Sequence, residues 1–300
     1  MSVVGIAYGA TDDYVLLLST SLKNTGNGTM SAQNETEKVT ILDLKKLKKN
    51  GEKITSLTAY DAGFATVLDN AGVDFILVGD SLGMVVQGRT TTIPVTIDEI
   101  IYHTQLVVRG SQRAMVMADM PFMSYSSPRD CLHNAARLMK EGGAEIVKLE
   151  WGELEISMVS RLTECGIPVC AHLGLTPQAI HKFGAYKVQG RQDDSAKKMI
   201  DDAFALEEAG ADVILLECVP MELAATITGN ATVPVIGIGA GEAVDGQILV
   251  LYDILDIWPG KRTRFSKNYM AQAGSIQGAV EAYVDEVKAV TFPTAEYSFK

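Results

Sequence analysis

The sequence lacks the long apolar runs and the excess of basic residues that would point to a membrane or a nucleic acid. A transmembrane helix needs about 18 or more consecutive apolar residues, and no run in these 300 residues reaches that length. Lysine and arginine number 26 against 37 aspartates and glutamates, which gives a formal charge of −11. Because nucleic-acid binding requires a basic face, the composition predicts neither partner.

Cysteine is also scarce, and its spacing excludes the usual uses of paired thiols. The four cysteines, Cys131, Cys165, Cys170 and Cys218, include no CxxC pair. The sequence therefore predicts neither a zinc site nor a disulfide framework, and we expect reduced core residues. The N-terminus lacks a cationic start followed by an apolar core and a cleavage site, so the expected location is the cytoplasm.

Composition divides the chain into a leader and one large domain. Within residues 1–38, the stretch 19–37 is polar and rich in Asn, Thr, Gly and Ser, which is typical of poorly ordered segments. We expect a disordered leader or extension over 1–38 and a single catalytic domain over 39–300. The first element of that domain is an amphipathic helix over 40–49, expected to cap one end of it. Its predicted apolar positions are Ile41, Leu42, Leu44 and Leu47.

The domain alternates short apolar runs with helical patterns. Strands are predicted over 54–60, 74–78, 114–118, 146–149, 169–173, 213–216, 235–238 and 248–252. Helices are predicted over 62–70, 97–109, 128–141, 154–165, 195–209 and 275–290. Continuous apolar strands are typical of parallel sheets buried on both faces. Eight of them with intervening helices favour an α/β fold of the (β/α)₈ TIM-barrel class, with an N-terminal capping helix and a C-terminal helix. The alternative is a doubly wound open sheet, but no GxGxxG follows the first strand.

Acidic residues follow several of these strands, beginning with the stretch FILVGDSLGM at 75–84. Asp80, Asp119, Glu150 and Glu217 each come at the end of an apolar run. In a barrel these ends share one face. A single acidic residue there is more often a helix N-cap or loop anchor, but four at equivalent positions indicate a site. Clustered carboxylates repel one another unless a cation lies between them. Because Mg²⁺ prefers oxygen ligands, we expect it to be that cation.

Two other residues on the same strands could face that site. Lys148 precedes Glu150 by two positions, so both side chains point to the same side of the strand. It could balance the carboxylates, bind a substrate carboxylate, or act as a Schiff-base nucleophile. His172 lies in the run 169–173 and is either a core residue or a pocket residue. The basic loop 182–191 is either solvated or a cover over an anionic ligand.

Six motifs together resemble the ketopantoate hydroxymethyltransferase family, in order over about residues 40–300. They are VGDSLGM at 78–84 with VQG at 86–88, ADMPFM at 118–123, HLGLTPQ at 172–178, YKVQGR at 186–191, LECVP at 216–220 and IGIGAG at 236–241.

The resemblance implies a Mg²⁺-dependent barrel enzyme, commonly a decamer, that acts on small molecules. It implies transfer of a one-carbon unit from 5,10-methylenetetrahydrofolate to 3-methyl-2-oxobutanoate, which gives 2-dehydropantoate in pantothenate biosynthesis. By the same resemblance, the metal ligands are Asp80, Asp119 and Glu150. The expected contacts to the keto acid are Asp80, Ser81, Asp119 and Lys148. Glu217 is the expected base, and His172 is an additional candidate.

Two departures from the family pattern concern the shape of the pocket. Trp151 follows the third metal ligand where the family usually has glycine, and Ala185 also replaces a common glycine. Two rival interpretations remain open. One is a Mg²⁺-dependent carbon–carbon lyase or mutase of the phosphoenolpyruvate mutase and isocitrate lyase type, although no cysteine here lies in the catalytic loop usual for that type. The other is a non-catalytic paralogue that keeps the barrel.

Overall fold

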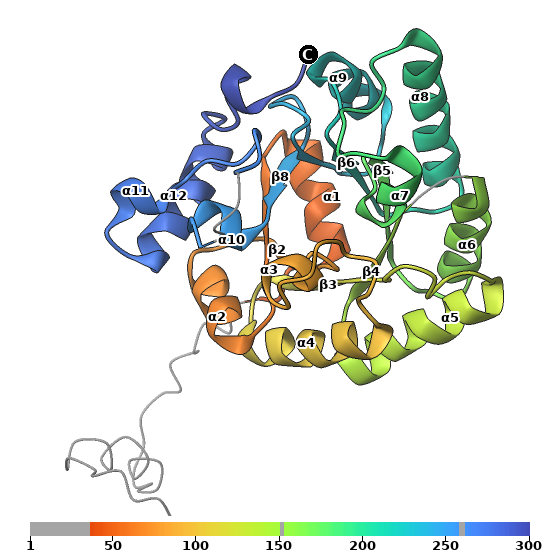
Figure 1. Cartoon of the computed structure of the whole chain (residues 1–300), viewed down its shortest axis with the longest axis horizontal. Coiled ribbons are helices and arrows are strands. Elements are labelled where there is room, and N and C mark those ends of the chain that lie inside the picture. The colour runs from red at the N-terminus through yellow and green to blue at the C-terminus, as the bar shows by residue number, and fades with distance from the viewer. Residues whose placement is uncertain (1–36, 151–152, 258–261) are drawn as a thin grey trace, which may run out of the picture. The chain divides into compact units, whose positions relative to one another are not determined.

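Eight parallel strands close into a barrel in the computed structural model, which describes residues 37–150, 153–257 and 262–300 (Figure 1). Each strand pairs with the next in the sequence, and β8 pairs with β1 to close the sheet. The predicted (β/α)₈ barrel is therefore confirmed, and the doubly wound alternative is excluded. The strands are β1 Ile54–Thr58, β2 Phe75–Val78, β3 Met115–Asp119, β4 Ile146–Glu150, β5 Val169–Gly174, β6 Val213–Glu217, β7 Val235–Ile238 and β8 Gly246–Leu249.

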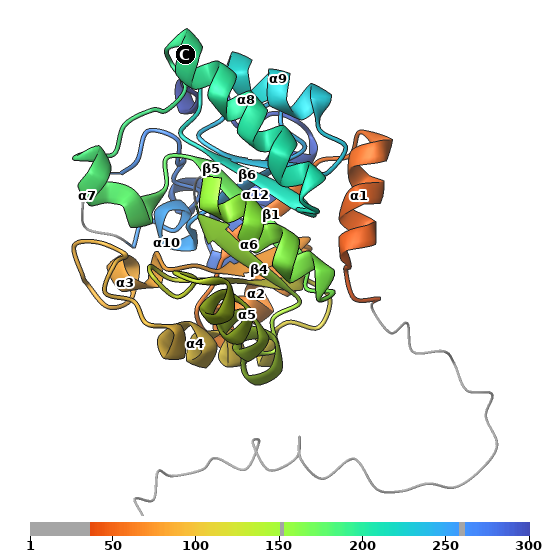
Figure 2. The same ribbon diagram turned by 90° about the vertical axis from the view of Figure 1, so that its right-hand side faces the viewer.

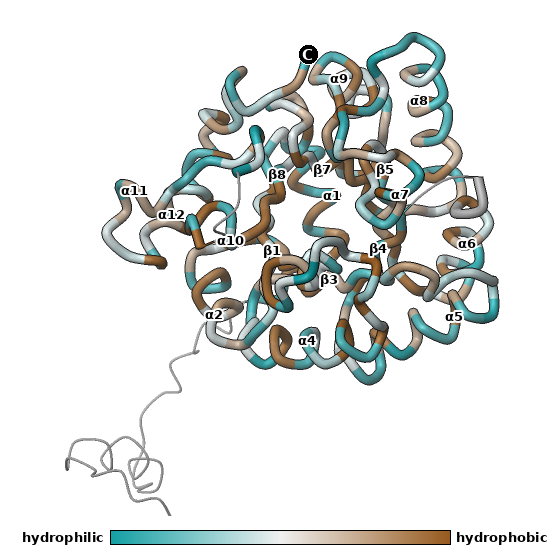
Figure 3. The backbone as a smooth tube through the Cα atoms, viewed as in Figure 1, coloured by the Kyte–Doolittle hydropathy of each residue, from teal (hydrophilic) through white to brown (hydrophobic). Residues whose placement is uncertain are grey.

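The strands form the core because both of their faces are covered. All residues of β1 to β4, β7 and β8 are buried, and in β5 and β6 only the last residue, Gly174 or Glu217, is partly exposed. This explains the continuous apolar runs in the sequence. Figure 3 shows such hydrophobic stretches along β4 and β8.

Helices surround the barrel, and several begin at a side-chain cap. In five helices the side chain of the residue before the helix accepts a hydrogen bond from a backbone N–H of the first turn. These residues are Thr40, Asp61, Thr96, Ser127 and Ser275. The helices are α1 Ile41–Asn50, α2 Ala62–Asn70, α3 Leu82–Val85, α4 Ile97–Gly110, α5 Pro128–Arg137, α6 Glu153–Glu164, α7 Ile180–Phe183, α8 Asp193–Glu208, α9 Met221–Asn230, α10 Leu251–Ile254, α11 Met270–Ala273 and α12 Ile276–Lys288.

The first and last predicted strands and one predicted helix differ from the structure. The strand expected over 54–60 ends at Thr58. The strand expected over 248–252 begins earlier, at Gly246, and ends at Leu249, because Leu251 donates its N–H to the Thr58 hydroxyl and starts α10. The helix expected over 128–141 changes to a π-helical turn over Leu138–Gly142. Sequence reasoning missed α9, whose β-branched residues have modest helix propensity, and which is held by packing against α8 and β7.

The helix α1 lies at the end of the barrel opposite to α3, α7 and α10 (Figure 2). The prediction that it caps one end of the barrel is confirmed. The prediction for Leu42 is wrong: its side chain is 75% exposed, while Leu44 is fully buried. Side chains two residues apart in a helix point in directions that differ by about 200°, so the two leucines lie on opposite faces of α1.

The C-terminal helix α12 packs against the closing seam of the barrel. Tyr283 is buried and donates a bifurcated hydrogen bond to the carbonyls of Ser56 on β1 and Gln247 on β8, at 2.9 and 3.0 Å. The predicted C-terminal helix is thus confirmed. None of the helices in the described ranges combines the length and the apolar character needed to cross a bilayer.

All four cysteines carry free thiols, as expected, but they are not all core residues. Cys131, Cys170 and Cys218 are buried, whereas Cys165 is exposed. Cys165 follows the last turn of α6, where the chain leaves the helix for the solvent-facing turn before β5.

Candidate active site

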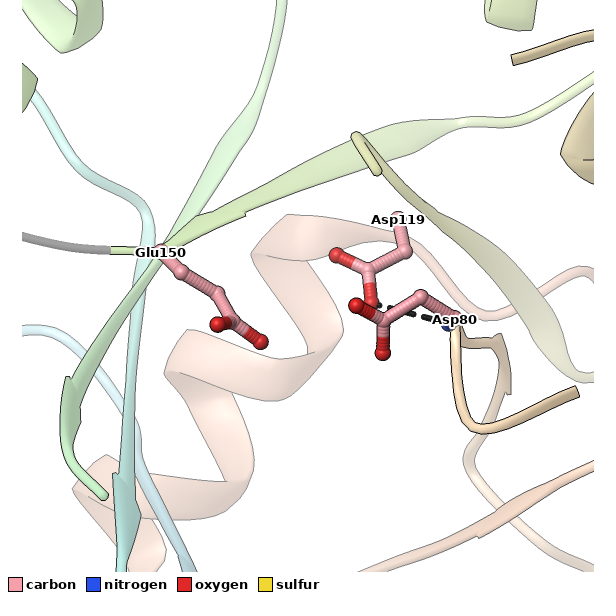
Figure 4. Close-up of side chains that lie close together, drawn as sticks. All are labelled: Asp80, Asp119 and Glu150. Atoms are coloured by element: carbon pink, nitrogen blue, oxygen red, sulfur yellow. Dashed lines mark hydrogen bonds between the residues drawn. The ribbon is translucent and has the colours of Figure 1, made fainter. Parts of the chain in front are cut away.

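Three acidic side chains from neighbouring strand ends converge at one end of the barrel (Figure 4). Asp119 and Glu150 are the last residues of β3 and β4, and Asp80 lies two residues beyond β2. Each carboxylate offers an oxygen, and these oxygens lie within 4.8 Å of one another. The prediction that strand-end carboxylates share a face is therefore confirmed for these three.

The cluster has the features of a cation site. All three residues are buried, and Oδ2 of Asp80 makes no hydrogen bond within the described part of the chain. The backbone N–H of Asp80 donates a hydrogen bond to Oδ2 of Asp119 at 3.1 Å. Burial, and then the charges of Asp119 and Glu150, raise the pKa of Asp80 well above its ordinary value. Buried oxygen donors that repel one another suit a hard divalent cation such as Mg²⁺.

Lys148 lies inside this acidic cluster. Its Nζ is 3.0 Å from Oδ1 of Asp119 and 3.3 Å from Oε1 of Glu150, and its side chain is 4% exposed. Although burial lowers the pKa of Lys148, the surrounding carboxylates raise it well above its ordinary value. The side chain is therefore a fixed ammonium at neutral pH, which argues against the Schiff-base alternative, since that role requires a neutral amine.

His172 connects the cluster to Glu217 on the adjacent strand. Its Nδ1 lies 3.4 Å from Oε1 of Glu150 and 3.3 Å from Nζ of Lys148, and its Nε2 lies 3.3 Å from Oε2 of Glu217. Burial and the Lys148 charge lower the pKa of His172, but the two glutamates outweigh them and raise it to about 9. His172 lines the cavity, so of the two alternatives left open by the sequence it is a pocket residue.

The charge state of Glu150 follows from its neighbours Lys148, His172 and Gln178. Burial raises the pKa of Glu150, whereas Lys148, His172 and the N–H of Gln178 lower it to about 2. Oε2 of Glu150 accepts the hydrogen bond from the Gln178 backbone at 3.0 Å. Glu150 therefore stays ionised, with both oxygens oriented by the protein.

Ser81 lies beside the cluster and is held by a buried phenol. Its Oγ is 2.8 Å from the hydroxyl of Tyr60, which is 2% exposed. Burial raises the pKa of Tyr60 well above its ordinary range, so the phenol stays neutral and can donate. Sequence reasoning found Ser81 but missed Tyr60, which follows β1 without a motif to mark it.

Close backbone packing fixes the position of Glu217. A Cβ added to Gly174, whose φ is +94°, would lie 2.2 Å from the carbonyl oxygen of Glu217. The same carbonyl accepts the N–H of Leu175 at 2.8 Å. The next residue, Cys218, has a φ of +50°, a strained value for a side-chain-bearing residue. The Glu217 side chain is 15% exposed and faces the pocket.

A cavity of about 610 Å³ opens over these residues and brings all the predicted site residues together. Its lining includes Asp80, Ser81, Asp119, Lys148, Glu150, His172 and Glu217. Sequence reasoning missed its other wall, formed by residues from β7 and β8 and from the C-terminal segments, including Phe265 and Phe299. These come from segments without a recognisable chemical motif, so only the fold could place them there.

The loop 182–191 reaches the cavity through part of its length. Tyr186, Lys187 and Val188 line it, and the Tyr186 hydroxyl lies 3.8 Å from Sδ of Met84, another lining residue. Of the two expectations, the covering role fits this placement, with Lys187 as the cation on the cavity side. Trp151, Gly152 and most of the leader over 1–38 lie outside the described residues, so the expectations for them are not addressed by the structure.

Comparison with known sequences identifies the family. A sequence model of ketopantoate hydroxymethyltransferase matches residues 38–295. The 3-methyl-2-oxobutanoate hydroxymethyltransferase of Alkalilimnicola ehrlichii is 58% identical over 261 residues, which cover 87% of this chain and 94% of that one. The enzyme of the same name from Shewanella loihica is 55% identical, with coverage of 87% and 99%.

Comparison with solved structures shows the same fold at much lower identity. A phosphonopyruvate hydrolase in complex with oxalate and Mg²⁺ has a TM-score of 0.56 and 13% identity, covering 86% of this chain and 92% of that one. A 2,3-dimethylmalate lyase has a TM-score of 0.53 and 18% identity, with coverage of 70% and 80%. These distant likenesses support the barrel alone, whereas the sequence match is specific: the chain belongs to the ketopantoate hydroxymethyltransferase family.

Proposed function

We propose that the protein transfers a hydroxymethyl group from 5,10-methylenetetrahydrofolate to 3-methyl-2-oxobutanoate. Water supplies the hydroxyl oxygen, and the products are 2-dehydropantoate and tetrahydrofolate. The observation that carries the proposal is one cavity that holds an oxygen-ligand cluster, a buried ammonium and a separate carboxylate, Glu217. The names of the relatives supply the substrates.

In this proposal the keto acid binds over Asp80, Ser81, Asp119 and Lys148. Asp80, Asp119 and Glu150 would hold Mg²⁺, which when bound supplies Lewis acidity and a template for the substrate oxygens. The Lys148 ammonium, fixed between two carboxylates, stabilises negative charge that develops on the keto oxygen. Ser81, oriented by Tyr60, donates a hydrogen bond to the substrate.

Glu217 acts as the base that removes the proton from C3 of the keto acid. One of its oxygens, Oε2, lies beside His172, and the partly exposed carboxylate faces the cavity. Loss of the C3 proton gives an enolate, whose carbon bonds to the one-carbon unit as the first of that unit's two C–N bonds to the folate breaks. Water then takes the place of the second nitrogen, which leaves the hydroxymethyl group on C3 and releases tetrahydrofolate. The proton stays on Glu217 until a folate nitrogen or solvent accepts it.

Proton removal can be tested apart from one-carbon transfer. We expect the protein to exchange the C3 hydrogen of 3-methyl-2-oxobutanoate for deuterium in D₂O without folate, so that the methyl doublet in the proton NMR spectrum collapses. The exchange should require Mg²⁺ and stop with EDTA. A rate equal to that of buffer with Mg²⁺ present would contradict the proposed chemistry.

The proposal also covers the extent of the catalytic domain, the cellular compartment and the oligomeric state. Residues 39–300 form the single catalytic domain, as the match over 38–295 supports. The free thiols fit a reducing compartment such as the cytoplasm. The protein is a homo-oligomer, for which sedimentation equilibrium is the direct test: a mass equal to the 32.3 kDa of one chain would contradict it.

A further inference from the structure

The cavity is much larger than the keto acid needs. Its volume of about 610 Å³ falls in the range of about 300–1,000 Å³ that holds drug-sized ligands. A five-carbon keto acid over Asp80, Asp119 and Lys148 would leave most of that space open. The rest of the cavity must therefore take another molecule or stay filled with water.

The wall opposite the charged cluster is apolar and aromatic. It consists of Ile238, Ile248, Leu249, Val250, Phe265 and Phe299. The rings of Phe265 and Phe299 meet edge to face, with centroids 6.4 Å apart and planes at 70°. The guanidinium of Arg264 lies 5.5 Å from the centroid of Phe299. Such a wall suits a flat heteroaromatic ring, which stacks on aromatic side chains and arginine.

These rings lie close to the proposed base. Glu217 pairs in register with Ile238 of β7, and the next residue is Gly239. A Cβ at Gly239 would lie 3.0 Å from ring atoms of both Phe265 and Phe299, so both rings pack on this glycine. The C-terminal segment is held in place, because the Phe299 carbonyl accepts the N–H of Met221 at 2.9 Å. A ring stacked there would be next to the strand end that carries Glu217.

One carboxylate belongs to this apolar side. Asp253 follows β8, lines the cavity, and accepts a hydrogen bond from the Thr263 hydroxyl at 3.4 Å. The nearby Arg262 pairs with Asp256 and not with Asp253. Burial raises the pKa of Asp253, and Thr263 and Arg262 lower it in part. A carboxylate in this position gains from a ligand that presents two adjacent N–H donors.

Resting on the proposed function, we infer that the wall formed by Phe265, Phe299 and Asp253 is the subsite for the pterin ring of the one-carbon carrier. The planar pyrimidinone half of that ring stacks against the phenylalanines. Its ring N–H and amino group donate to Asp253. The carrier's reactive carbon then points across the cavity toward the keto acid and Glu217, and its acidic tail leaves through the opening.

The test measures binding of tetrahydrofolate by calorimetry. Asp253→Asn and Phe299→Leu should each weaken binding about 10-fold or more, which is about 1.4 kcal/mol. Asp256→Asn is the matched control, because Asp256 lies three residues away and pairs with Arg262 without lining the cavity. The deuterium exchange at C3 of the keto acid, which needs no folate, should keep its wild-type rate in all three variants.

A second measurement needs no variant. On the wild-type protein, 6-methyltetrahydropterin should displace tetrahydrofolate, whereas p-aminobenzoylglutamate, which has the tail but no pterin, should displace it far less. Unchanged tetrahydrofolate binding in both cavity variants, a parallel fall in keto-acid exchange, or displacement mainly by the tail fragment would overturn the inference. Tetrahydrofolate binding with these signatures but without product would instead overturn the proposed function alone.

Discussion

Nε2 of His172 lies 3.3 Å from Oε2 of Glu217, across the seam between β5 and β6. The other ring nitrogen, Nδ1, faces Glu150 at 3.4 Å and Lys148 at 3.3 Å. One imidazole thus touches both the carboxylate proposed as base and a carboxylate of the proposed cation site. We interpret His172 as the residue that orients Glu217.

Two substitutions separate the two contacts of His172. The amide of His172→Gln can reach the position of Nε2, whereas that of His172→Asn reaches only the position of Nδ1. If the contact with Glu217 matters most, the asparagine variant should lose about 10–100-fold in kcat, the range seen for residues that orient a functional group. The glutamine variant should recover much of that loss, with the KM for the keto acid little changed in both. Equal kcat values for the two variants would refute this role.

Replacing Glu217 by glutamine should remove the base and keep the shape of the pocket. We expect Glu217→Gln to lower kcat by about 10²–10⁴-fold, as general bases typically contribute. Calorimetric titrations with Mg²⁺ and with the keto acid should give wild-type affinities, because Glu217 lies outside the cluster of Asp80, Asp119 and Glu150. Turnover near the wild-type value would show that another group takes the proton.

Mg²⁺ should stabilise the folded protein through the three carboxylates. At a concentration 100 times its Kd, a ligand that binds only the folded state adds about 2.7 kcal/mol to the free energy of unfolding. We expect urea unfolding to show such a gain in the wild type and little or none in Asp80→Asn. The control Asp98→Asn changes an exposed carboxylate that pairs with Arg137 and should keep the gain. Equal gains in both variants would place the cation elsewhere.

Replacing Gly174 by alanine should reduce activity by more than the loss of folded-state stability explains. Gly174 and Gly166 both have positive φ, of +94° and +77°, but only at Gly174 would a Cβ clash, 2.2 Å from the Glu217 carbonyl. The positive φ alone should cost each alanine variant about 1–2 kcal/mol in the free energy of unfolding, and the clash at Gly174 should add to that cost. Only Gly174→Ala should also reduce kcat, because the Glu217 backbone must move. Comparable activity in the two folded variants would contradict this.

The sequence allowed most of the barrel to be predicted because buried parallel strands are nearly pure apolar runs. The bounds of β7 were predicted without error, and those of β2 to β6 to within a residue at each end. The prediction failed at β8, where the hydroxyl of Thr58, distant in the sequence, sets the end of the strand. It also failed at Leu42, because apolar character alone does not say which face of α1 packs on the barrel.

The charged half of the cavity was predictable for a related reason. A carboxylate at a strand end, such as Asp80 or Glu150, stands out against the apolar run before it. Phe265, Phe299 and Tyr60 do not stand out, since an aromatic residue is ordinary in a core, and only the closed fold brings them to the cavity. The π-helical turn after α5 likewise depends on packing against α4.

The most direct test of the account is formation of 2-dehydropantoate by the purified protein. The assay contains Mg²⁺, 5,10-methylenetetrahydrofolate and 3-methyl-2-oxobutanoate, with a parallel reaction in EDTA. We predict product and tetrahydrofolate in equal amounts with Mg²⁺, and almost none with EDTA. Absence of product in both reactions, from protein that is folded and binds the keto acid, would contradict the proposed hydroxymethyl transfer.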